Sequence, residues 1–192
     1  MYSKIYFWNI VIKISLTYVV FILENLNQYI KSYVDFPKKG IIFRDALGIL
    51  QEPEIFKELI EKMSSTELIN KAEAIISVDA RGFIFGSAIS LKTSKPMIVA
   101  RKPNKLPGEL LKRSYDLEYG KNTLYIQRES LDKYKSYAIV DDLLATGGTV
   151  KCIYEMLDSL GKTITGLSIV VELKNLSARN KLPFTVDSQI IY

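Results

Sequence analysis

Short apolar runs alternate with amphipathic segments along most of this 192-residue chain. Some runs are continuous, rich in β-branched residues and followed by charged or turn residues, which is typical of buried strands; they are Ala74–Val78, Pro96–Ala100, Tyr137–Asp141 and Ile164–Leu173. Apolar residues recur at helical spacing in Pro53–Met63, Phe83–Leu91 and Val150–Leu160. Strands that alternate with helices predict an α/β fold, in which helices cover both faces of a mainly parallel sheet.

The remaining segments are predicted from turn residues as well as from apolar spacing. Apolar positions after Glu24 recur at helical spacing, which predicts a helix that ends before Pro37. A turn over Asp35–Gly40 and a short extended segment over Ile41–Asp45 follow. Further along, we predict a polar loop over Lys102–Ser114 and then a hairpin, turning at Gly120–Asn122 between Tyr115–Tyr119 and Thr123–Gln127. We expect Tyr115 and Tyr119 to pack within this hairpin.

Residues 5–23 form a nearly continuous apolar stretch whose length reaches that of a transmembrane helix. Lys13, near its middle, would be costly inside a membrane, and no small-residue cleavage site follows. We expect an added helix or strand packed on the domain or on a partner, or an upstream extension of the reading frame; a membrane or targeting role is the alternative. The predicted organisation is an apolar extension over residues 1–23 and a single domain over residues 24–192.

Lys and Arg outnumber Asp and Glu by 26 to 21, which gives a formal charge of +5. The basic residues are scattered rather than gathered in a stripe, so a small polyanionic substrate fits better than nucleic acid. The sequence has no histidine and a single cysteine, Cys152, which we expect to pack within a helix. His-dependent triads, His-ligated zinc and internal disulfides are therefore excluded, and acid–base chemistry falls to carboxylates, Lys or Tyr. A metal would be a hard cation such as Mg²⁺, held partly by substrate phosphates.

The most specific motif is the run from Tyr137 to Thr149, an apolar strand that ends in two carboxylates and is followed by small and hydroxyl residues. Its two glycines let the backbone approach an anion closely, and amides at the start of the next helix would point at a phosphate. The two carboxylates, at the carboxyl end of a strand, are placed to accept bonds from sugar hydroxyls or a hydrated metal. The alternative is a plain strand end followed by a turn and a helix cap.

Charged clusters follow three predicted strands, and parallel strands bring such clusters to one edge of the sheet; the clusters are Asp79–Gly82, Arg101–Gly108 and Asp141–Asp142. The second cluster supplies basic side chains suited to a phosphate-like anion, because Arg donates forked hydrogen bonds and Lys adds a point charge. The alternative for this second cluster is a solvated basic loop whose Pro and Gly residues are turn residues.

These motifs carry a resemblance to a known family. The Tyr137–Thr149 run resembles the motif with which type I phosphoribosyltransferases bind phosphoribosyl pyrophosphate (PRPP). Taken together, six segments across roughly residues 24–192 resemble the adenine phosphoribosyltransferases; they are Asp35–Asp45, Asp79–Gly86, Arg101–Gly108, Ser114–Gly120, Val140–Thr149 and Val171–Leu173. The sequence departs from the family pattern at Ala178, where glycine is frequent, and residues up to Leu23 have no counterpart.

The resemblance implies the type I phosphoribosyltransferase fold, with a twisted, mainly parallel sheet and a flexible hood loop or hairpin over the active site. It implies transfer of the phosphoribosyl group from PRPP to adenine, giving AMP and pyrophosphate in purine salvage, with Mg²⁺ and in a cytoplasmic homodimer. The alternatives are transfer to another purine base, against which the Phe43–Arg44 segment argues, and a PRPP-sensing regulator, against which Glu118 and the basic loop argue.

The resemblance also implies roles for individual residues. The 5′-phosphate is held by Ala145, Thr146, Gly147, Gly148 and Thr149, and the ribose hydroxyls face Asp141 and Asp142, directly or through Mg²⁺. Pyrophosphate is bound by Arg81, beside a strained or cis peptide around Asp79–Ala80, and by Arg101, Lys102 and Lys105, some of them from the partner subunit. Adenine lies against Ile42, Phe43 and Arg44, and Glu118 is the acid or base near its nitrogens.

Overall fold

The computed structural model describes residues 26–117 and 120–192. The apolar N-terminal stretch and Glu118 lie outside these residues. The chain divides after Leu59 into two compact units, and each is described by itself. The prediction of a single domain over residues 24–192 stays a prediction. Among the described helices, none combines the length and the apolar character needed to cross a membrane.

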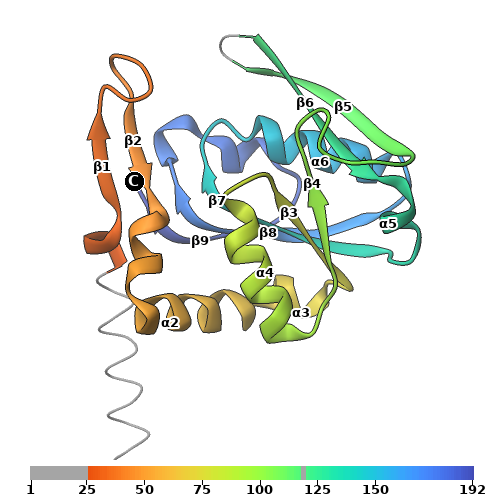
Figure 1. Cartoon of the computed structure of the whole chain (residues 1–192), viewed down its shortest axis with the longest axis horizontal. Coiled ribbons are helices and arrows are strands. Elements are labelled where there is room, and N and C mark those ends of the chain that lie inside the picture. Colours follow the sequence, from red (N-terminus) through yellow and green to blue (C-terminus); the bar gives the residue numbers. More distant parts are fainter. Residues whose placement is uncertain (1–25, 118–119) are drawn as a thin grey trace, which may run out of the picture. The chain divides into compact units, whose positions relative to one another are not determined.

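The first unit contains a two-stranded antiparallel ribbon, drawn in orange in Figure 1. Its elements are η1 (Leu26–Tyr29), β1 (Lys31–Val34), β2 (Ile42–Asp45) and η2 (Ala46–Gln51), and α2 (Pro53–Ser64) follows. The turn between the strands is closed by the Gly40 amide, which donates to the Asp35 carboxylate at 2.6 Å.

The helix predicted to continue from Glu24 to the residues before Pro37 is wrong beyond Tyr29. Residues 31–34 instead form β1, which pairs with β2 in the register Lys31↔Asp45 to Val34↔Ile42. The apolar positions in this segment are compatible with both helical and strand spacing. Pairing with β2, further along the chain, stabilises the extended conformation. The extended segment predicted over Ile41–Asp45 and the helix predicted over Pro53–Met63 are both confirmed, as β2 and α2.

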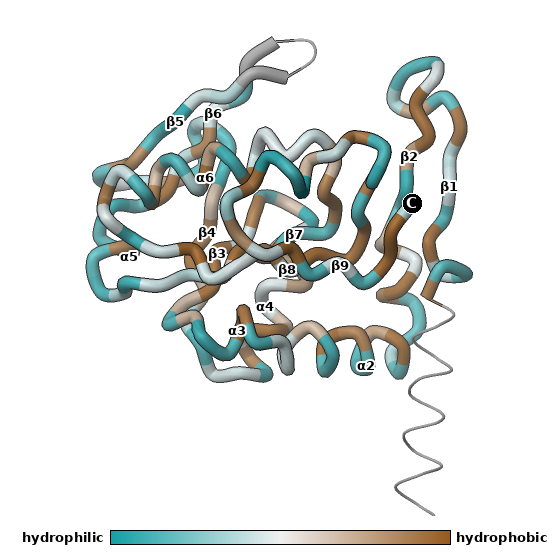
Figure 2. Tube along the Cα trace, turned by 180° about the vertical axis from the view of Figure 1, so that it is seen from behind, coloured by the Kyte–Doolittle hydropathy of each residue, from teal (hydrophilic) through white to brown (hydrophobic). Residues whose placement is uncertain are grey.

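The second unit is built on a parallel sheet in the order β4-β3-β7-β8-β9. Its strands are β3 (Ala74–Val78), β4 (Met97–Ala100), β7 (Ser136–Leu144), β8 (Thr163–Glu172) and β9 (Val186–Ile191). The four strands predicted from apolar runs are confirmed, and β9 was missed. Figure 2 shows that the central strands carry the strongly apolar part of the trace, as expected for strands covered on both faces.

Helices cover both faces of this sheet. They are α3 (Glu67–Lys71), α4 (Gly82–Thr93), α5 (Arg128–Asp132) and α6 (Gly148–Asp158), with short 3₁₀ turns η3 (Lys174–Leu176) and η4 (Ala178–Lys181). Helix α4 packs so closely on β3 that a side chain at Gly86 would overlap Ser77. On the opposite face, Ile153 and Met156 of α6 join a buried cluster with Ile139. Cys152 is buried there as predicted, and burial raises the pKa of its thiol to about 11.

A long hairpin leaves the sheet, formed by β5 (Leu110–Leu117) and β6 (Gly120–Gln127) (Figure 1). The predicted hairpin is therefore confirmed, but two details are wrong. The strand begins at Leu110, inside the predicted polar loop, and Gly120 pairs with Leu117, so Gly120–Asn122 lies in a strand rather than in the turn. Backbone hydrogen bonds of 2.9 and 2.8 Å between Arg101 and Tyr125 tie the hairpin to the end of β4.

Candidate active site

The loop between β7 and α6 has the geometry of an anion-binding turn. Strand β7 continues three residues beyond the predicted end, to Leu144, and α6 begins at Gly148. Gly147 caps the helix with φ 81° and ψ 1°, a left-handed conformation in which a side chain would be strained. The first backbone amides of α6 lack intrahelical acceptors, so the loop presents donors at the positive end of an 11-residue helix.

Two carboxylates stand side by side at the end of β7. Asp142 is buried, and its Oδ2 lies 2.7 Å from Nε of Arg81, which comes from the turn after β3. Asp141 Oδ1 accepts a hydrogen bond from the Asp142 amide at 2.9 Å. Burial raises the pKa of Asp141 well above its ordinary value, and the neighbouring carboxylate of Asp142 raises it further. The Arg81 side chain opposes this shift only in part.

Gly82 is required for this arrangement. A Cβ atom on Gly82 would lie 2.7 Å from Asp141 Oδ1 and 3.1 Å from the Val140 carbonyl oxygen. The start of α4 therefore approaches the carboxylates as closely as backbone can, which only glycine permits.

The basic loop after β4 is joined to the end of β3. Arg101 Nε donates to Asp79 Oδ2 at 3.1 Å, and the guanidinium carbon lies 5.6 Å from the centre of the Phe83 ring. Arg101 Nη1 also donates to the Lys105 carbonyl oxygen at 3.5 Å, while the side chain of Lys105 is exposed. The Asp79–Ala80 peptide bond is cis, in agreement with the family resemblance.

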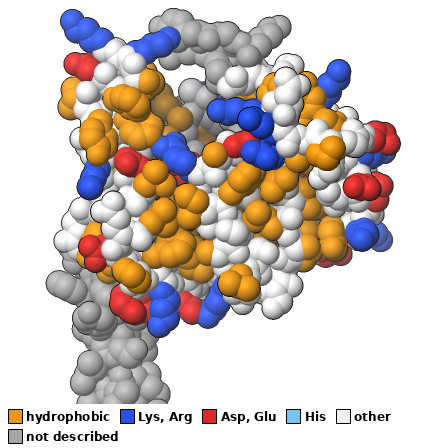
Figure 3. All heavy atoms as spheres, viewed as in Figure 1, with side chains coloured by type: hydrophobic (Ala, Val, Ile, Leu, Met, Phe, Trp, Pro, Cys, Tyr) orange, Lys and Arg blue, Asp and Glu red, His pale blue; other side chains and the backbone are white. Residues whose placement is uncertain are grey.

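A cavity of about 430 Å³ opens at the carboxyl edge of the sheet, and Arg101 and Lys105 are not among its lining residues. Figure 3 shows basic side chains, with an acidic one among them, gathered where the loops after β3 and β7 lie in Figure 1. Among the predicted residues, the cavity is lined by Arg81, Lys102, Asp141, Asp142 and Thr149. Three strand ends therefore converge on one site, as expected for parallel strands.

The hairpin contributes residues to the cavity that sequence reasoning did not select. Tyr115 and its cross-strand partner Asn122 both line it. Tyr115 packs against the core as expected, and its hydroxyl also accepts a hydrogen bond from Thr149 Oγ1 at 3.0 Å. Apolar spacing cannot distinguish a tyrosine that packs from one that also reaches a ligand site, so the sequence carried no signal for this contact.

The predicted base-binding residues lie in the first unit, on β2. Phe43 makes an edge-on contact with Phe36, with ring centres 5.2 Å apart. Arg44 Nη1 donates to Ser32 Oγ at 2.5 Å across the ribbon, and Ile42 is about half exposed. This segment therefore offers extended backbone beside aromatic and aliphatic surface.

Comparison with known proteins shows the family. The chain is 66% identical, over 171 residues, to an adenine phosphoribosyltransferase of Prochlorococcus marinus (strain MIT 9515); the match covers 88% of this chain and all of that protein. The chain belongs to the adenine phosphoribosyltransferase family. It is therefore a phosphoribosyl-transferring enzyme, as the motifs predicted. None of the protein-family models compared with the chain matches it.

Solved adenine phosphoribosyltransferases have the same fold. The crystal structure from Thermoanaerobacter pseudethanolicus aligns with a TM-score of 0.83 at 36% identity, covering 88% of this chain and 99% of that one. The enzyme from Saccharomyces cerevisiae, complexed with adenine and an iminoaltritol bisphosphate, aligns with a TM-score of 0.82 at 32% identity over the same shares. The predicted type I phosphoribosyltransferase fold is thereby confirmed.

Proposed function

We propose that this chain transfers the phosphoribosyl group of PRPP to adenine, releasing AMP and pyrophosphate, at the edge where β3, β4 and β7 end. The observation that supports the location is the pair of ionic contacts Arg101–Asp79 and Arg81–Asp142, which fix cations and carboxylates at three strand ends. Three of these residues, Asp79, Arg81 and Asp142, line one cavity. The adenine bound in the yeast relative supports the choice of base.

The phosphates of PRPP would be held by the loop after β7 and by the basic side chains. The loop offers backbone amides and the Thr146 hydroxyl to the 5′-phosphate through Ala145, Thr146, Gly147, Gly148 and Thr149, while the Thr149 hydroxyl donates its proton to Tyr115. Pyrophosphate gains negative charge as it leaves ribose C1, and fixed cations stabilise that charge; they are Arg81, Arg101, Lys102 and Lys105. Because Arg81 and Arg101 are already tied to carboxylates, less ordering remains to be done when the substrate binds.

Asp141 and Asp142 would face the ribose hydroxyls, directly or through Mg²⁺. Two adjacent carboxylates are hard oxygen donors, and a cation beside them would offset their mutual repulsion, so these residues fit the ion. Within residues 26–117 and 120–192, no group of three or more potential metal ligands is found, so substrate phosphates would supply further ligands. When bound, Mg²⁺ neutralises charge on the departing pyrophosphate.

Removing divalent cations should abolish turnover if this assignment is correct. We expect pyrophosphate release in EDTA to fall to the level without enzyme, and excess Mg²⁺ to restore it, because the leaving group depends on charge neutralisation. The rate is measured with a coupled pyrophosphate assay in which the coupling enzymes are first shown to work under each condition. An unchanged rate in EDTA would remove the metal from the proposal.

Adenine would lie against Ile42, Phe43 and Arg44, where backbone groups read the edge of the base and apolar side chains cover its face. The attacking nitrogen of adenine must lose a proton, and Glu118 is the proposed acceptor. Positive charge that develops on the ribose would be stabilised by the carboxylates of Asp141 and Asp142.

Tyr115→Phe should weaken PRPP binding without affecting adenine. Thr149 donates its only hydroxyl proton to the tyrosine hydroxyl at 3.0 Å, so the tyrosine O–H is left to donate to a phosphate in the cavity that Tyr115 lines. We expect the KM for PRPP to rise about fivefold, the loss of one hydrogen bond, with kcat and the KM for adenine nearly unchanged. Steady-state kinetics with Tyr154→Phe as the control measure this, since Tyr154 packs on Phe184, outside the cavity lining. An unchanged KM for PRPP would exclude Tyr115 from phosphate binding.

We further propose a cytoplasmic homodimer in which the partner subunit supplies some of the pyrophosphate contacts. The family resemblance supports this, and the exposed side chains of Lys102 and Lys105 are accessible to a second subunit. Light scattering during size-exclusion chromatography gives the mass in solution, and a monomer at assay concentration would contradict the dimer. Cell fractionation of the chain with and without residues 1–23 tests the location.

The proposed reaction is tested by purine-dependent pyrophosphate release with PRPP and Mg²⁺. Adenine, hypoxanthine, guanine and xanthine are compared at equal concentration, and AMP is identified by chromatography. We expect turnover with adenine only. Turnover with another base would keep the phosphate site and change the base, whereas PRPP binding without any turnover would favour a regulator.

A further inference from the structure

The segment after β8 is bonded to the strand that leads into the phosphate loop. Glu172, the last residue of β8, pairs with Leu144, the last residue of β7. The Leu173 amide donates to the Leu144 carbonyl oxygen at 2.9 Å. Because Ala145 follows directly, this bond fixes the point at which the loop leaves the sheet.

A second contact is made at the turn of the loop itself. The Cβ atom of Ala178, a buried residue at the start of η4, lies 3.1 Å from the position that a Cβ would take on Gly147. Gly147 is the left-handed cap of α6. No space for a side chain therefore remains between the turn and Ala178, so a displacement of η4 toward the loop would reach the amides that follow Gly147.

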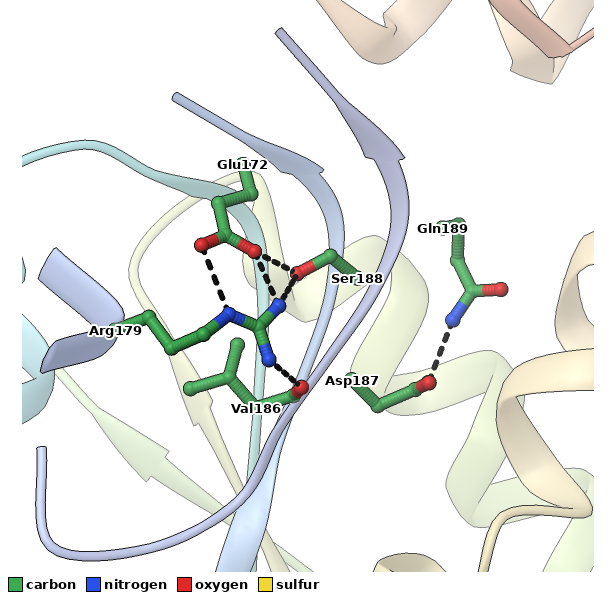
Figure 4. A network of polar contacts seen from close by, with 6 residues as sticks. All are labelled: Glu172, Arg179, Val186, Asp187, Ser188 and Gln189. Carbon is green, nitrogen blue, oxygen red and sulfur yellow. Dashed lines mark hydrogen bonds and ion pairs between the residues drawn. The ribbon is translucent and has the colours of Figure 1, made fainter. Parts of the chain in front are cut away.

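Arg179 anchors η4, as Figure 4 shows. Its Nε donates to Glu172 Oε1 at 3.1 Å, and its Nη2 donates to the other carboxylate oxygen and, at 2.9 Å, to Ser188 Oγ. Its Nη1 donates to the Val186 carbonyl oxygen, and the Ser188 hydroxyl donates to Glu172. The Arg179 guanidinium thus ties η4 to the end of β8 and to the first residues of β9.

The side chains of Glu172, Arg179 and Ser188 are hydrogen-bonded to one another. The Glu172 side chain is 5% exposed, and the forked bond from Arg179 keeps the pKa of its carboxyl below the ordinary value. The turns η3 and η4 are only three and four residues long and are separated by Ser177 at φ 50°. Short 3₁₀ turns have little stability of their own, so Arg179 is the main anchor of η4.

We propose that Arg179 is a positioning residue for the phosphate of the sugar substrate, acting with Glu172 to hold Ala178 against Gly147. This inference rests on the proposed function, since it assumes that the loop binds the 5′-phosphate. Neither Arg179 nor Glu172 is among the residues that line the cavity. Their effect is therefore expected in the binding of PRPP and of ribose 5-phosphate, not in the binding of adenine.

Arg179→Gln should raise the KM for PRPP about tenfold, since a small displacement of a loop that positions substrate has a large effect. Gln retains a donor but loses the fork and the charge. Arg179→Lys keeps the charge with a single point of contact, and we expect an intermediate KM. The KM for adenine should stay within about twofold in both variants, because the base is not held by this loop. Asn180→Ala, at the exposed neighbouring residue, is the control.

Because Arg179→Gln leaves a buried carboxylate without its cationic partner, it also lowers stability. Two further variants separate the effects. Glu172→Gln combined with Arg179→Gln removes both charges, and Ala178→Val leaves the ion pair intact while pressing on Gly147. Each should still raise the KM for PRPP selectively. If melting temperatures fall but the KM for PRPP is unchanged in every variant, Arg179 is merely structural and the inference is overturned.

Calorimetric titration with ribose 5-phosphate separates this inference from the proposed function. A wild-type protein that does not turn over adenine would contradict the proposed function, yet a weaker affinity for ribose 5-phosphate in Arg179→Gln than in Asn180→Ala would still support the positioning role. Equal affinities in the two variants, or no binding by the wild-type protein, would overturn it.

Discussion

Asp141→Asn lowers kcat/KM by about 100-fold and raises the melting temperature, because the desolvated negative charge of Asp141 serves the reaction and lowers the stability of the fold. Asp141 and Asp142 are adjacent, and the ion pair with Arg81 is made by Asp142. Asn keeps the oxygen that accepts the Asp142 amide at 2.9 Å, so the local backbone is preserved. What is lost is the negative charge that would face the ribose.

The change in stability has a definite pH dependence. The pKa of Asp141 is raised in the folded protein, so the folded state holds this proton more tightly than the unfolded state does. Between the ordinary and the raised pKa, the unfolded state loses the proton first, and stability falls as pH rises. The Asn variant has no carboxyl to titrate at this position, so its stability does not fall in this way. Its advantage over the wild type should be absent below the ordinary pKa of Asp and should grow as pH rises toward the raised pKa of Asp141.

Thermal unfolding from acid to neutral pH, with parallel kinetics at saturating adenine, measures both effects. Asp158→Asn, an exposed carboxylate near the end of α6, is the matched control and should leave activity and its pH profile unchanged. An Asp141→Asn protein that melts lower than the wild type at neutral pH would contradict the charge argument. A variant with full activity would remove Asp141 from the site.

Glu118→Ala lowers kcat by about 1,000-fold while the KM for PRPP changes little, as expected for loss of an acid or base that acts on adenine. The sequence has no histidine, so a carboxylate is the natural acceptor for the proton that adenine loses. Glu118 directly follows Leu117 in the sequence, and Leu117 ends β5, the strand from which Tyr115 lines the cavity.

Glu118→Gln distinguishes proton transfer from hydrogen bonding, because Gln has a similar shape and cannot accept the proton. We expect it to be as slow as Glu118→Ala. Glu109→Ala, in the loop before the same hairpin, is the control and should be nearly as active as the wild type. Single-turnover measurements separate chemistry from product release, and a Gln variant with wild-type kcat would show that Glu118 does not carry the proton.

The parallel sheet was predictable because its strands are buried on both faces. Such strands appear in the sequence as continuous apolar runs, and β3, β4, β7 and β8 were found from them. Strand β1 was mistaken for a helix, since its extended form depends on pairing with β2. The start of β5 was mistaken for a loop because only two leucines precede the exposed polar residues Lys112, Arg113 and Ser114.

The sequence indicated which residues belong to the site, but it did not indicate which of their side chains are in contact. Adjacent carboxylates and a glycine turn are local in sequence, so Asp141 to Thr149 could be identified directly. The ion pairs Arg101–Asp79 and Arg81–Asp142 depend on which strands are neighbours and on side-chain packing. The contact of Ala178 with Gly147 joins residues separated by a helix and a strand, so no sequence spacing indicates it.

The most direct test of the account is a crystal structure of the protein with AMP. We predict that the 5′-phosphate lies on the amides between Ala145 and Thr149, with the ribose hydroxyls facing Asp141 and Asp142 and the base on residues 42–44. AMP bound elsewhere, or with its phosphate away from the loop that begins α6, would contradict the assignment of this edge of the sheet as the active site.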